Sequence, residues 1–250
     1  MKFSIITVVR NAEGTIRDTI QSVLSQSHPH IEYIVIDGAS EDDTLKVIGD
    51  FRGSIDLLLS EPDSGLYDAM NKAISKASGD VIGILNADDI FERKEVLEKV
   101  NSLFEKSGAL GVYGDLVYVA RDDLTSVHRY WKSGIPDRKK FLWGWMPPHP
   151  SLFIKKEVFN RFGNYNTSLR SAADYELMLR IIYKHQIKLA YLPEIVTRMR
   201  TGGLSNKHWG SRIRANREDR KAWEMNGLTP YFFTTILKPL RKIPQYFQRP

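Results

Sequence analysis

Residues 78–89 read SGDVIGILNADD, in which an apolar run ends abruptly in polar and acidic side chains. The run at 81–85 is typical of a strand that is buried on both faces inside a parallel sheet. The side chains that end it are Asn86, Ala87, Asp88 and Asp89. They follow the carboxyl end of the strand, where open α/β sheets bind ligands, and carboxylates there suit Mg²⁺ or Mn²⁺ shared with a phosphate. The stretch therefore predicts an α/β fold with a metal-assisted nucleotide site.

Strands and helices alternate on both sides of this stretch. Before it, the apolar patterns predict strands at 3–9, 33–36 and 55–59, and helices at 13–26, 40–48 and 66–77. After it, they predict helices at 94–106, 155–162 and 174–184, and strands at 111–119, within 121–135, and at 151–154, 189–191 and 195–200. Such alternation predicts right-handed βαβ units. We expect a Rossmann-like, mostly parallel central sheet flanked by helices.

Composition limits the classes of protein to which the chain can belong. Its 250 residues, of which 42% are hydrophobic, suffice for one substantial domain with an appendage. The absence of cysteine excludes disulfides, thiolate metal sites and cysteine nucleophiles. The amino terminus lacks the pattern of a signal peptide, and no apolar run approaches the roughly 20 residues that span a bilayer. We expect a cytoplasmic protein that is soluble or peripheral to a membrane.

The net charge of +6 is concentrated toward the carboxyl terminus. We expect a catalytic domain over 1–206 and a basic, aromatic-rich helical extension over 207–250. Interleaved aromatic and basic side chains suit a segment that lies on an anionic membrane. A helix that packs on the domain or on a second subunit, as in a homodimer, explains the composition almost as well. We expect no nucleic-acid partner.

Several polar residues elsewhere occupy positions that suit either chemistry or a local structural role. Asp37 ends a predicted strand before a glycine, so it could accept hydrogen bonds from a ribose or cap the next helix. Asp63 and Gly65 join a strand to a helix start that could bind an anion, or Asp63 could cap that helix. Arg200 and Ser205 lie in a basic, glycine-containing loop whose chemistry fits a diphosphate.

Five segments, in order and at suitable spacing, closely resemble the family 2 glycosyltransferases, which are inverting enzymes of the GT-A fold. They are SIITVVRN at 4–11, IVIDGASEDDT at 34–44, SEPDSGLYDAMNKAI at 60–74, GDVIGILNADD at 79–89 and AADYELMLR at 172–180. The resemblance covers residues 2–206. It is greatest to the small bacterial members that assemble exopolysaccharide, capsule or O-antigen. A set of several motifs is far more specific than any single motif.

The resemblance implies a donor site for a nucleotide-diphosphate sugar, with a UDP-sugar preferred. It implies that the following residues bind the donor: Thr7, Val9, Arg10, Asn11, Asp37, Asp63, Gly65, Asn86, Ala87, Arg200 and Ser205. Asp88 matches the metal ligand of the family's DXD motif, and Asp89 supports it; the cofactor would be Mn²⁺ or Mg²⁺. Asn86 stands at the first position of that motif, which removes one negative charge.

The acceptor side is implied by two further segments. Asp174 aligns with the family's catalytic base, although Ala173 replaces the glutamate of the usual pair; Glu176 is the alternative base. Trp145 and His149 would line the acceptor side, where Trp145 could equally belong to the core. The acceptor would be a saccharide or a glycan linked to undecaprenyl diphosphate. Such an acceptor implies a peripheral location at the inner face of the cytoplasmic membrane.

Two other functions are compatible with parts of the sequence. A sugar nucleotidyltransferase also has an α/β nucleotide domain and acidic metal ligands. It should, however, carry a glycine-rich basic loop after the first strand, and residues 9–14 have little of that character. A non-catalytic protein that binds membranes or polyanions through its basic tail would keep its function after Asp88→Asn and Asp174→Asn.

Overall fold

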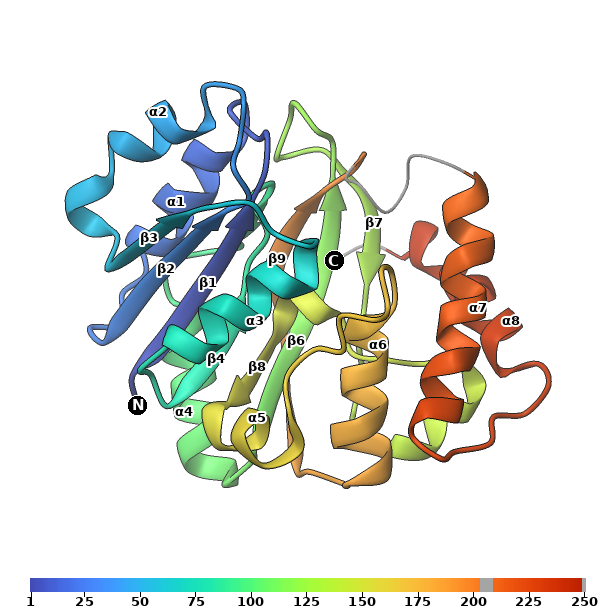
Figure 1. Cartoon of the computed structure of the whole chain (residues 1–250). Helices are drawn as coiled ribbons and strands as arrows, with labels where there is room; N and C mark the ends of the chain where they lie inside the picture. The colour runs from blue at the N-terminus through green and yellow to red at the C-terminus, as the bar shows by residue number, and fades with distance from the viewer. Residues whose placement is uncertain (203–208, 249–250) are drawn as a thin grey trace.

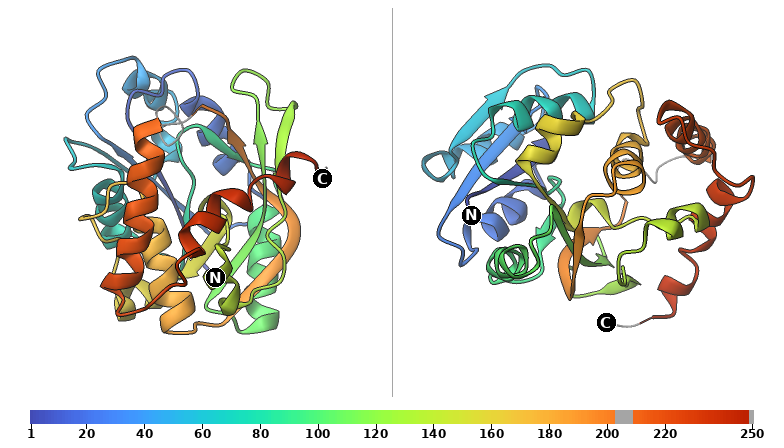
Figure 2. Two further views of the ribbon diagram at one scale, coloured as in Figure 1. Left: turned by 90° about the vertical axis from the view of Figure 1, so that its right-hand side faces the viewer. Right: turned by 90° about the horizontal axis from the view of Figure 1, so that it is seen from below.

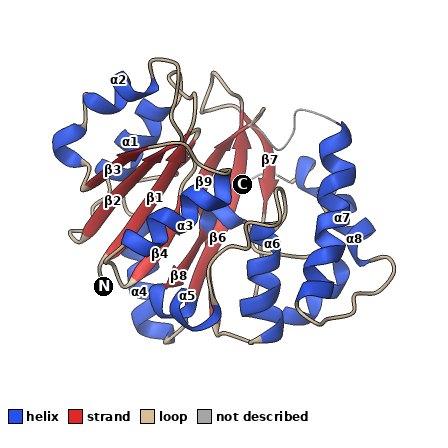
Figure 3. Cartoon of the chain, viewed as in Figure 1, coloured by secondary structure: helices blue, strands red, loops and turns tan. Residues whose placement is uncertain are grey.

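One nine-stranded sheet runs through the centre of the molecule and is covered by helices on both faces (Figure 1, Figure 3). The computed structural model describes residues 1–202 and 209–248, and for 209–213 it describes the backbone only. The strands are ordered β3-β2-β1-β4-β8-β6-β9-β5, and β7 pairs with β6. The expected α/β architecture is therefore confirmed.

The amino-terminal half of the sheet is wholly parallel. It comprises β1 (Phe3–Val9), β2 (Ile31–Asp37), β3 (Leu57–Ser60) and β4 (Val81–Ile84). Every residue of β1 and β4 is buried, as the continuous apolar runs predict. Because β1 and β2 pair in register from Phe3↔Ile31 to Val9↔Asp37, their carboxyl ends lie side by side. This register brings two predicted parts of the donor site together.

The carboxy-terminal half of the sheet is mixed. It contains β5 (Asp89–Phe91), β6 (Gly111–Val119), β7 (Val127–Trp131), β8 (Leu152–Lys155) and β9 (Leu189–Arg200). β6 and β9 are parallel, whereas β8 joins the two halves by pairing antiparallel with both β4 and β6. The prediction of two separate strands at 189–191 and 195–200 was wrong. They form one strand, whose pairing shifts opposite Gly114, close to Pro193, which has no N–H to donate.

Two cores form because successive side chains of each strand point to opposite faces of the sheet. On one face, Ile6 and Val8 pack with α3 (Leu66–Lys76), α5 (Lys156–Phe162) and α6 (Ala173–Met178). On the other, Phe3, Ile5 and Val9 pack with α1 (Ile16–Leu24), α2 (Thr44–Gly49) and α4 (Val96–Ser107). α6 continues as a π-helical turn, η4 (Leu179–Lys184), which completes the predicted helix over 174–184. Short 3₁₀ turns lie at η1 (Arg52–Ser54), η2 (Arg138–Trp143) and η3 (His149–Ser151).

The carboxy-terminal extension lies on the flank opposite β2 and β3 (Figure 1, Figure 2). It consists of α7 (Trp209–Met225), α8 (Thr234–Leu240) and the 3₁₀ turn η6 (Pro244–Tyr246). Trp223 is fully buried, and its indole N–H donates to the Tyr175 hydroxyl of α6 at 2.9 Å. This part of the extension therefore packs on the body that carries the predicted base. Among the described residues, no helix is long and apolar enough to cross a bilayer.

Candidate active site

The acidic turn after β4 holds one carboxylate in the interior and another nearer the surface. Asp89 is completely buried; Asn86 donates to its Oδ2 at 3.0 Å, while Oδ1 has no hydrogen-bond partner among the described residues. Burial, together with the charge of Asp88, raises the pKa of Asp89 well above its ordinary value. Burial also raises the pKa of Asp88, which the charges of Arg121 and Arg200 oppose. The turn therefore holds two adjacent carboxylates that are costly to ionise without a further cation.

This arrangement fits a divalent cation in part. Two neighbouring carboxylates, one with an unpartnered oxygen, are the type of donor that Mg²⁺ and Mn²⁺ prefer. Asp88 is the more exposed of the two and fits a direct ligand, whereas Asp89 fits a supporting position behind it. The described residues contain no group of three histidine or carboxylate side chains that could hold a metal by themselves. Donor phosphates or water would have to complete the coordination.

Arg200 braces this turn from within the protein. Its side chain is 5% exposed and donates to the carbonyl oxygen of Asp88 at 3.0 Å, to that of Arg121 at 3.0 Å, and to the carboxylate of Asp18. These contacts occupy the N–H groups of its guanidinium, and its charge is paired with Asp18. Arg200 therefore holds the backbone that presents Asp88, and direct binding of the donor by Arg200 stays a prediction.

The predicted nucleoside residues split into a buried and an exposed set. Thr7 and Val9 are buried, and the Tyr33 hydroxyl donates to Thr7 Oγ1 at 3.1 Å. These two side chains therefore belong to the core beneath the site. Asp37 is also fully buried and accepts from the backbone N–H of Ser40 at 3.1 Å and from the Ser60 hydroxyl at 2.6 Å. Asp37 therefore orders the loop at 38–41.

Three separate segments meet at Gly38. A Cβ placed on this glycine would collide with the Asp63 carboxylate and lie 3.6 Å from Arg10 Cδ, so any other residue here would displace the Asp63 side chain. Arg10 and Asn11 are exposed, and Asn11 has a left-handed backbone (φ 51°). Its backbone N–H donates to Ser40 Oγ at 2.8 Å, and its side chain accepts from the N–H of Glu41 at 2.9 Å. The structure thus brings the ends of β1 and β2 and the loop at 63–65 together.

The loop before α3 is shaped by Asp63 and Gly65. Asp63 Oδ1 accepts from the Gly65 N–H at 2.8 Å, and Gly65 has a φ of 126°, which other residues rarely adopt. Asp63 therefore does not cap α3 in the usual way, because its partner is the glycine that precedes the helix. Its other oxygen faces Gly38.

Asp174 lies in a cluster of aromatic side chains that come from three segments. The Tyr67 hydroxyl on α3 donates to Asp174 Oδ1 at 3.1 Å, and the Tyr67 ring stacks on Tyr165 with centroids 5.5 Å apart. Tyr165 in turn shares a 2.6 Å hydrogen bond with His149 Nε2. Asp174 is only partly buried, and its Oδ2 has no hydrogen-bond partner among the described residues. That oxygen can accept a proton from a ligand.

The titratable side chains of this aromatic cluster beside Asp174 are uncharged at pH 7. Burial and the nearby Asp174 charge raise the pKa of Tyr67 and of Tyr165, so both phenols keep their protons. Burial lowers the pKa of His149, although the Asp174 charge opposes this, so its imidazole is neutral at pH 7. The cluster therefore offers a hydrogen-bond donor to the carboxylate without a competing cation.

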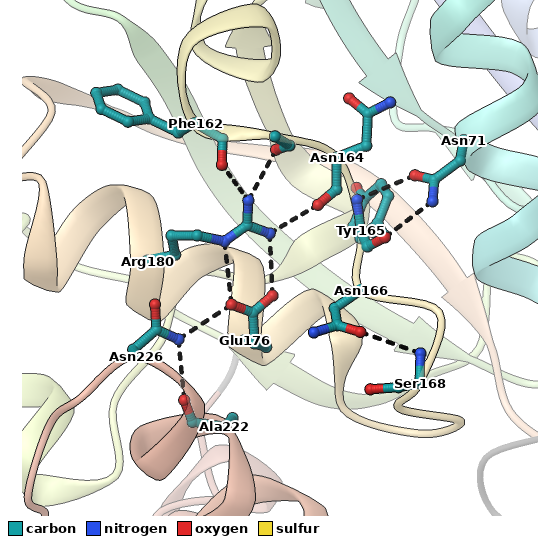
Figure 4. Close-up of polar contacts among 11 residues, drawn as sticks. Asn71, Phe162, Asn164, Tyr165, Asn166, Ser168, Glu176, Arg180, Ala222 and Asn226 are labelled. Atoms are coloured by element: carbon teal, nitrogen blue, oxygen red, sulfur yellow. Dashed lines mark hydrogen bonds and ion pairs between the residues drawn. The ribbon is translucent and has the colours of Figure 1, made fainter.

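Glu176, the alternative base, is engaged in a buried ion pair (Figure 4). Arg180 Nη2 lies 3.0 Å from Glu176 Oε2, and Asn226 of the extension donates to Glu176 Oε1 at 3.0 Å. The same guanidinium donates to the carbonyl oxygens of Phe162, Gly163 and Asn164. Glu176 is 3% exposed, so the alternative assignment was wrong. Its carboxylate has the structural role of joining α6, the loop after α5 and the extension.

Asn71 holds the same loop from the opposite side. Its side chain donates to the Tyr165 carbonyl oxygen at 2.8 Å and accepts from the Tyr165 N–H at 3.0 Å (Figure 4). Asn71 follows Tyr67 by four residues, so both project from the same face of α3. Sequence reasoning missed Tyr67 and Tyr165 as members of the site. The i, i+4 spacing within the motif at 60–74 was a usable signal for Tyr67.

Three further predicted residues lie as follows. Trp145 packs in the core, the alternative that the sequence left open: it is 5% exposed, its indole donates to the Ser133 carbonyl oxygen at 2.9 Å, and its ring packs on Phe141. Ala87 is buried within the acidic turn. Ser205 lies outside the described residues. A cavity of about 420 Å³ borders Glu176 and Arg180, whereas Asp174 and the predicted donor and metal residues do not line it.

Known proteins match this chain in both sequence and fold. A family model described as glycosyl transferase family 2 matches residues 4–165. An uncharacterized glycosyltransferase of Mycobacterium tuberculosis is 33% identical over 180 residues, which cover 71% of this chain and 67% of that protein. A PGL/p-HBAD biosynthesis glycosyltransferase of Mycobacterium bovis is 27% identical over 209 residues, which cover 82% of this chain and 79% of that protein.

Two solved structures share the fold at low sequence identity. TarS of S. aureus, in complex with UDP-GlcNAc, matches with a TM-score of 0.70 and 17% identity, over 90% of this chain and 65% of that one. The chain thus spans just under two thirds of that fragment of TarS, residues 1–349, and 44% of a longer TarS chain. The mannosyltransferase PcManGT of Pyrobaculum calidifontis, in complex with GDP-Man and Mn²⁺, matches with a TM-score of 0.66 and 17% identity, over 98% of this chain and 73% of that one. These matches confirm the predicted GT-A fold.

Proposed function

The chain belongs to glycosyl transferase family 2, and we propose that it transfers a sugar from a nucleotide-diphosphate sugar to a saccharide acceptor with inversion. A UDP-sugar is the favoured donor and a lipid-linked saccharide the favoured acceptor, in bacterial surface polysaccharide biosynthesis. The family match carries the proposal. The relatives named above support it, since one takes part in PGL/p-HBAD biosynthesis and TarS binds UDP-GlcNAc.

The donor would bind over the carboxyl ends of β1, β2 and β4. Arg10, Asn11 and Asp63 are available to contact the nucleoside, because their segments converge at Gly38. Asp37 would act indirectly by ordering the loop at 38–41. Asn86 and Asp88 would face the diphosphate and the sugar from the turn that Arg200 braces.

Asp88, supported by Asp89, would hold Mn²⁺ or Mg²⁺. When bound, the ion supplies positive charge that stabilises the departing nucleoside diphosphate. Burial raises the pKa of Asp88, and a bound cation would offset this by stabilising the ionised carboxylate.

Asp174 would act as the general base. Its Oδ2 would accept the proton of the acceptor hydroxyl while that oxygen attacks the anomeric carbon and the bond to the nucleoside diphosphate breaks. Tyr67 supports this role, because its hydrogen bond occupies Oδ1 and orients the carboxylate. His149 lies beside Asp174 and is the candidate contact to the acceptor sugar.

A panel of UDP- and GDP-sugars with Mn²⁺ or Mg²⁺ tests the proposal through release of the nucleoside diphosphate. We expect release with at least one UDP-sugar. Asp174→Asn should lower transfer by about 10²- to 10⁴-fold while donor affinity stays close to that of the unmodified protein. Asp88→Asn should weaken the metal dependence and the donor affinity together. Release from no donor, or full turnover in Asp174→Asn, would show the assignment to be wrong.

A further inference from the structure

The end of the chain presents a row of outward-facing apolar side chains. Of the large apolar and aromatic side chains that the described residues expose, eight of fourteen lie between residues 225 and 247. Five of them recur at spacings of four, four, three and four residues; two lie in α8, and the others lie in the turns before and after it. They are Phe232, Ile236, Leu240, Ile243 and Phe247, with exposed fractions of 81%, 54%, 50%, 54% and 83%. We call this row the apolar ridge.

The opposite side of the same segment is anchored to the protein. Thr234 is fully buried and donates to the Leu142 carbonyl oxygen at 2.7 Å. Lys238 donates to Asp219 at 2.6 Å and lies 3.7 Å from the centre of the Tyr175 ring. The ridge is therefore exposed because α8 is fixed with that face outward, along the surface that faces the viewer in the left panel of Figure 2.

The sequence of this segment carries basic and no acidic side chains. No aspartate or glutamate follows Glu224, whereas four basic residues do; one of them, Lys238, is paired with Asp219 of α7 and therefore adds no net charge beside the ridge. Arg241 is exposed and lies next to Leu240, at the middle of the ridge. A second copy of this chain would meet the ridge with the same positive charges. Complementarity instead favours a negatively charged, apolar partner, and a bilayer that contains anionic lipids has both properties.

We propose that α8 and η6 dock on an anionic membrane surface, with the apolar ridge inserted at the boundary between headgroups and acyl chains. Docking would hold the catalytic body at the membrane, where a lipid-linked acceptor resides. Only the link between docking and a lipid-linked acceptor rests on the proposed function. Vesicle binding and sugar transfer to a soluble acceptor are separate measurements, so either can fail without the other.

Co-sedimentation of the full chain with vesicles tests the proposal. We expect binding to vesicles of phosphatidylglycerol mixed with phosphatidylcholine, weaker binding at high salt, and little binding to phosphatidylcholine alone. The double variant Phe232→Ser/Ile236→Ser should bind about tenfold more weakly or worse. Arg241→Gln should bind about fivefold more weakly. Leu45→Ser, which removes a 37% exposed leucine on α2, is the matched control and should bind normally.

Four outcomes would overturn the proposal. They are no binding to the anionic vesicles, equal binding to the neutral vesicles, unchanged binding by the double variant with a normal circular dichroism spectrum, and an equal loss in Leu45→Ser. Sedimentation velocity tests whether the ridge instead joins two copies of the chain. If the protein self-associates and the double variant does not, the ridge is an interface between copies of the chain, and the membrane assignment falls.

Discussion

The hydrogen bond from Tyr67 to Asp174 allows a sharp test of the base. Tyr67→Phe removes one hydroxyl and leaves the ring, so the stack on Tyr165 with a centroid distance of 5.5 Å remains. The lost bond spans 3.1 Å and ends on a carboxylate. Hydrogen bonds to charged groups are worth about 1.5–3 kcal/mol, and each 1.4 kcal/mol corresponds to about a tenfold change in rate. Loss of a bond that orients the base should therefore lower the rate by about ten- to a hundredfold.

The Tyr67 hydroxyl acts by positioning the carboxylate. The raised pKa of Tyr67 keeps the phenol protonated, so it can donate to Asp174 Oδ1 and leave Oδ2 for the acceptor hydroxyl. Without this hydrogen bond the carboxylate is less well oriented toward the acceptor. We expect kcat/KM to fall about ten- to a hundredfold while donor affinity stays unchanged.

Other charged or titratable groups face Asp174 and stay in place. They are Tyr165, His149 and Asp219, the last of which is paired with Lys238 at 2.6 Å. The assay is nucleoside diphosphate release from pH 5 to 9, with thermal unfolding as a check on the fold. Tyr113→Phe is the matched control, because it also removes a mostly buried hydroxyl, one that donates to the Gly134 carbonyl oxygen at 2.6 Å.

The refuting result is specific. If Tyr67→Phe leaves kcat/KM unchanged, Tyr67 does not orient the base. If Tyr113→Phe lowers kcat/KM equally, the effect comes from a general loss of stability and not from Asp174.

Three further predictions concern stability and the donor site. Arg180→Met leaves the buried Glu176 carboxylate without its ion-pair partner, so the free energy of unfolding in urea should fall by about 3–5 kcal/mol. The double variant Glu176→Leu/Arg180→Met should lose less, and an equal or larger loss would contradict this account. Burial is the largest single influence on the pKa of Glu32 and raises it, but the hydrogen bonds from Ser4 and Ser78 and the charge of Lys2 together outweigh it and lower the pKa from 4.5 to about 2. Because the ionised form is favoured in the folded state, its contribution of about 1–2 kcal/mol, after solvent screening, is present above pH 4.5 and lost toward pH 2. Acid unfolding of Glu32→Gln should lack this component. Gly38→Ala makes a methyl group collide with the Asp63 carboxylate and should weaken donor binding by calorimetry more than it lowers the melting temperature.

Element positions followed from the sequence where the apolar pattern was strong. The strands predicted at 3–9 and 111–119 have the observed bounds, and the strand predicted at 81–85 ends one residue earlier, at Ile84. Burial on both faces leaves an uninterrupted apolar run, and such a run is local information. The antiparallel insertion of β8 between β4 and β6 was not predictable, because pairing depends on contacts between residues far apart in the chain.

In the candidate site, too, local sequence motifs identified residues whose contacts only the fold determines. The motifs indicated which residues carry polar chemistry, and Asp88 and Asp174 remain the proposed ligand and base. The resemblance favoured Asp174 over Glu176, two residues apart at the start of one helix, but gave no physical reason for the choice. Packing supplies one: Glu176 pairs with Arg180, whereas Asp174 Oδ2 has no hydrogen-bond partner among the residues that the structure describes.

The sequence by itself determined the fold class, the family, and the positions of the acidic turn and the candidate base. Side-chain periodicity and short motifs carry that information, since both arise from neighbours along the chain. The tertiary structure alone decided that Trp145 belongs to the core, that Arg200 braces the Asp88 turn, and that Tyr67 donates to Asp174. Burial and hydrogen-bond partners depend on segments that are distant in sequence and meet only when the sheet and its helices assemble.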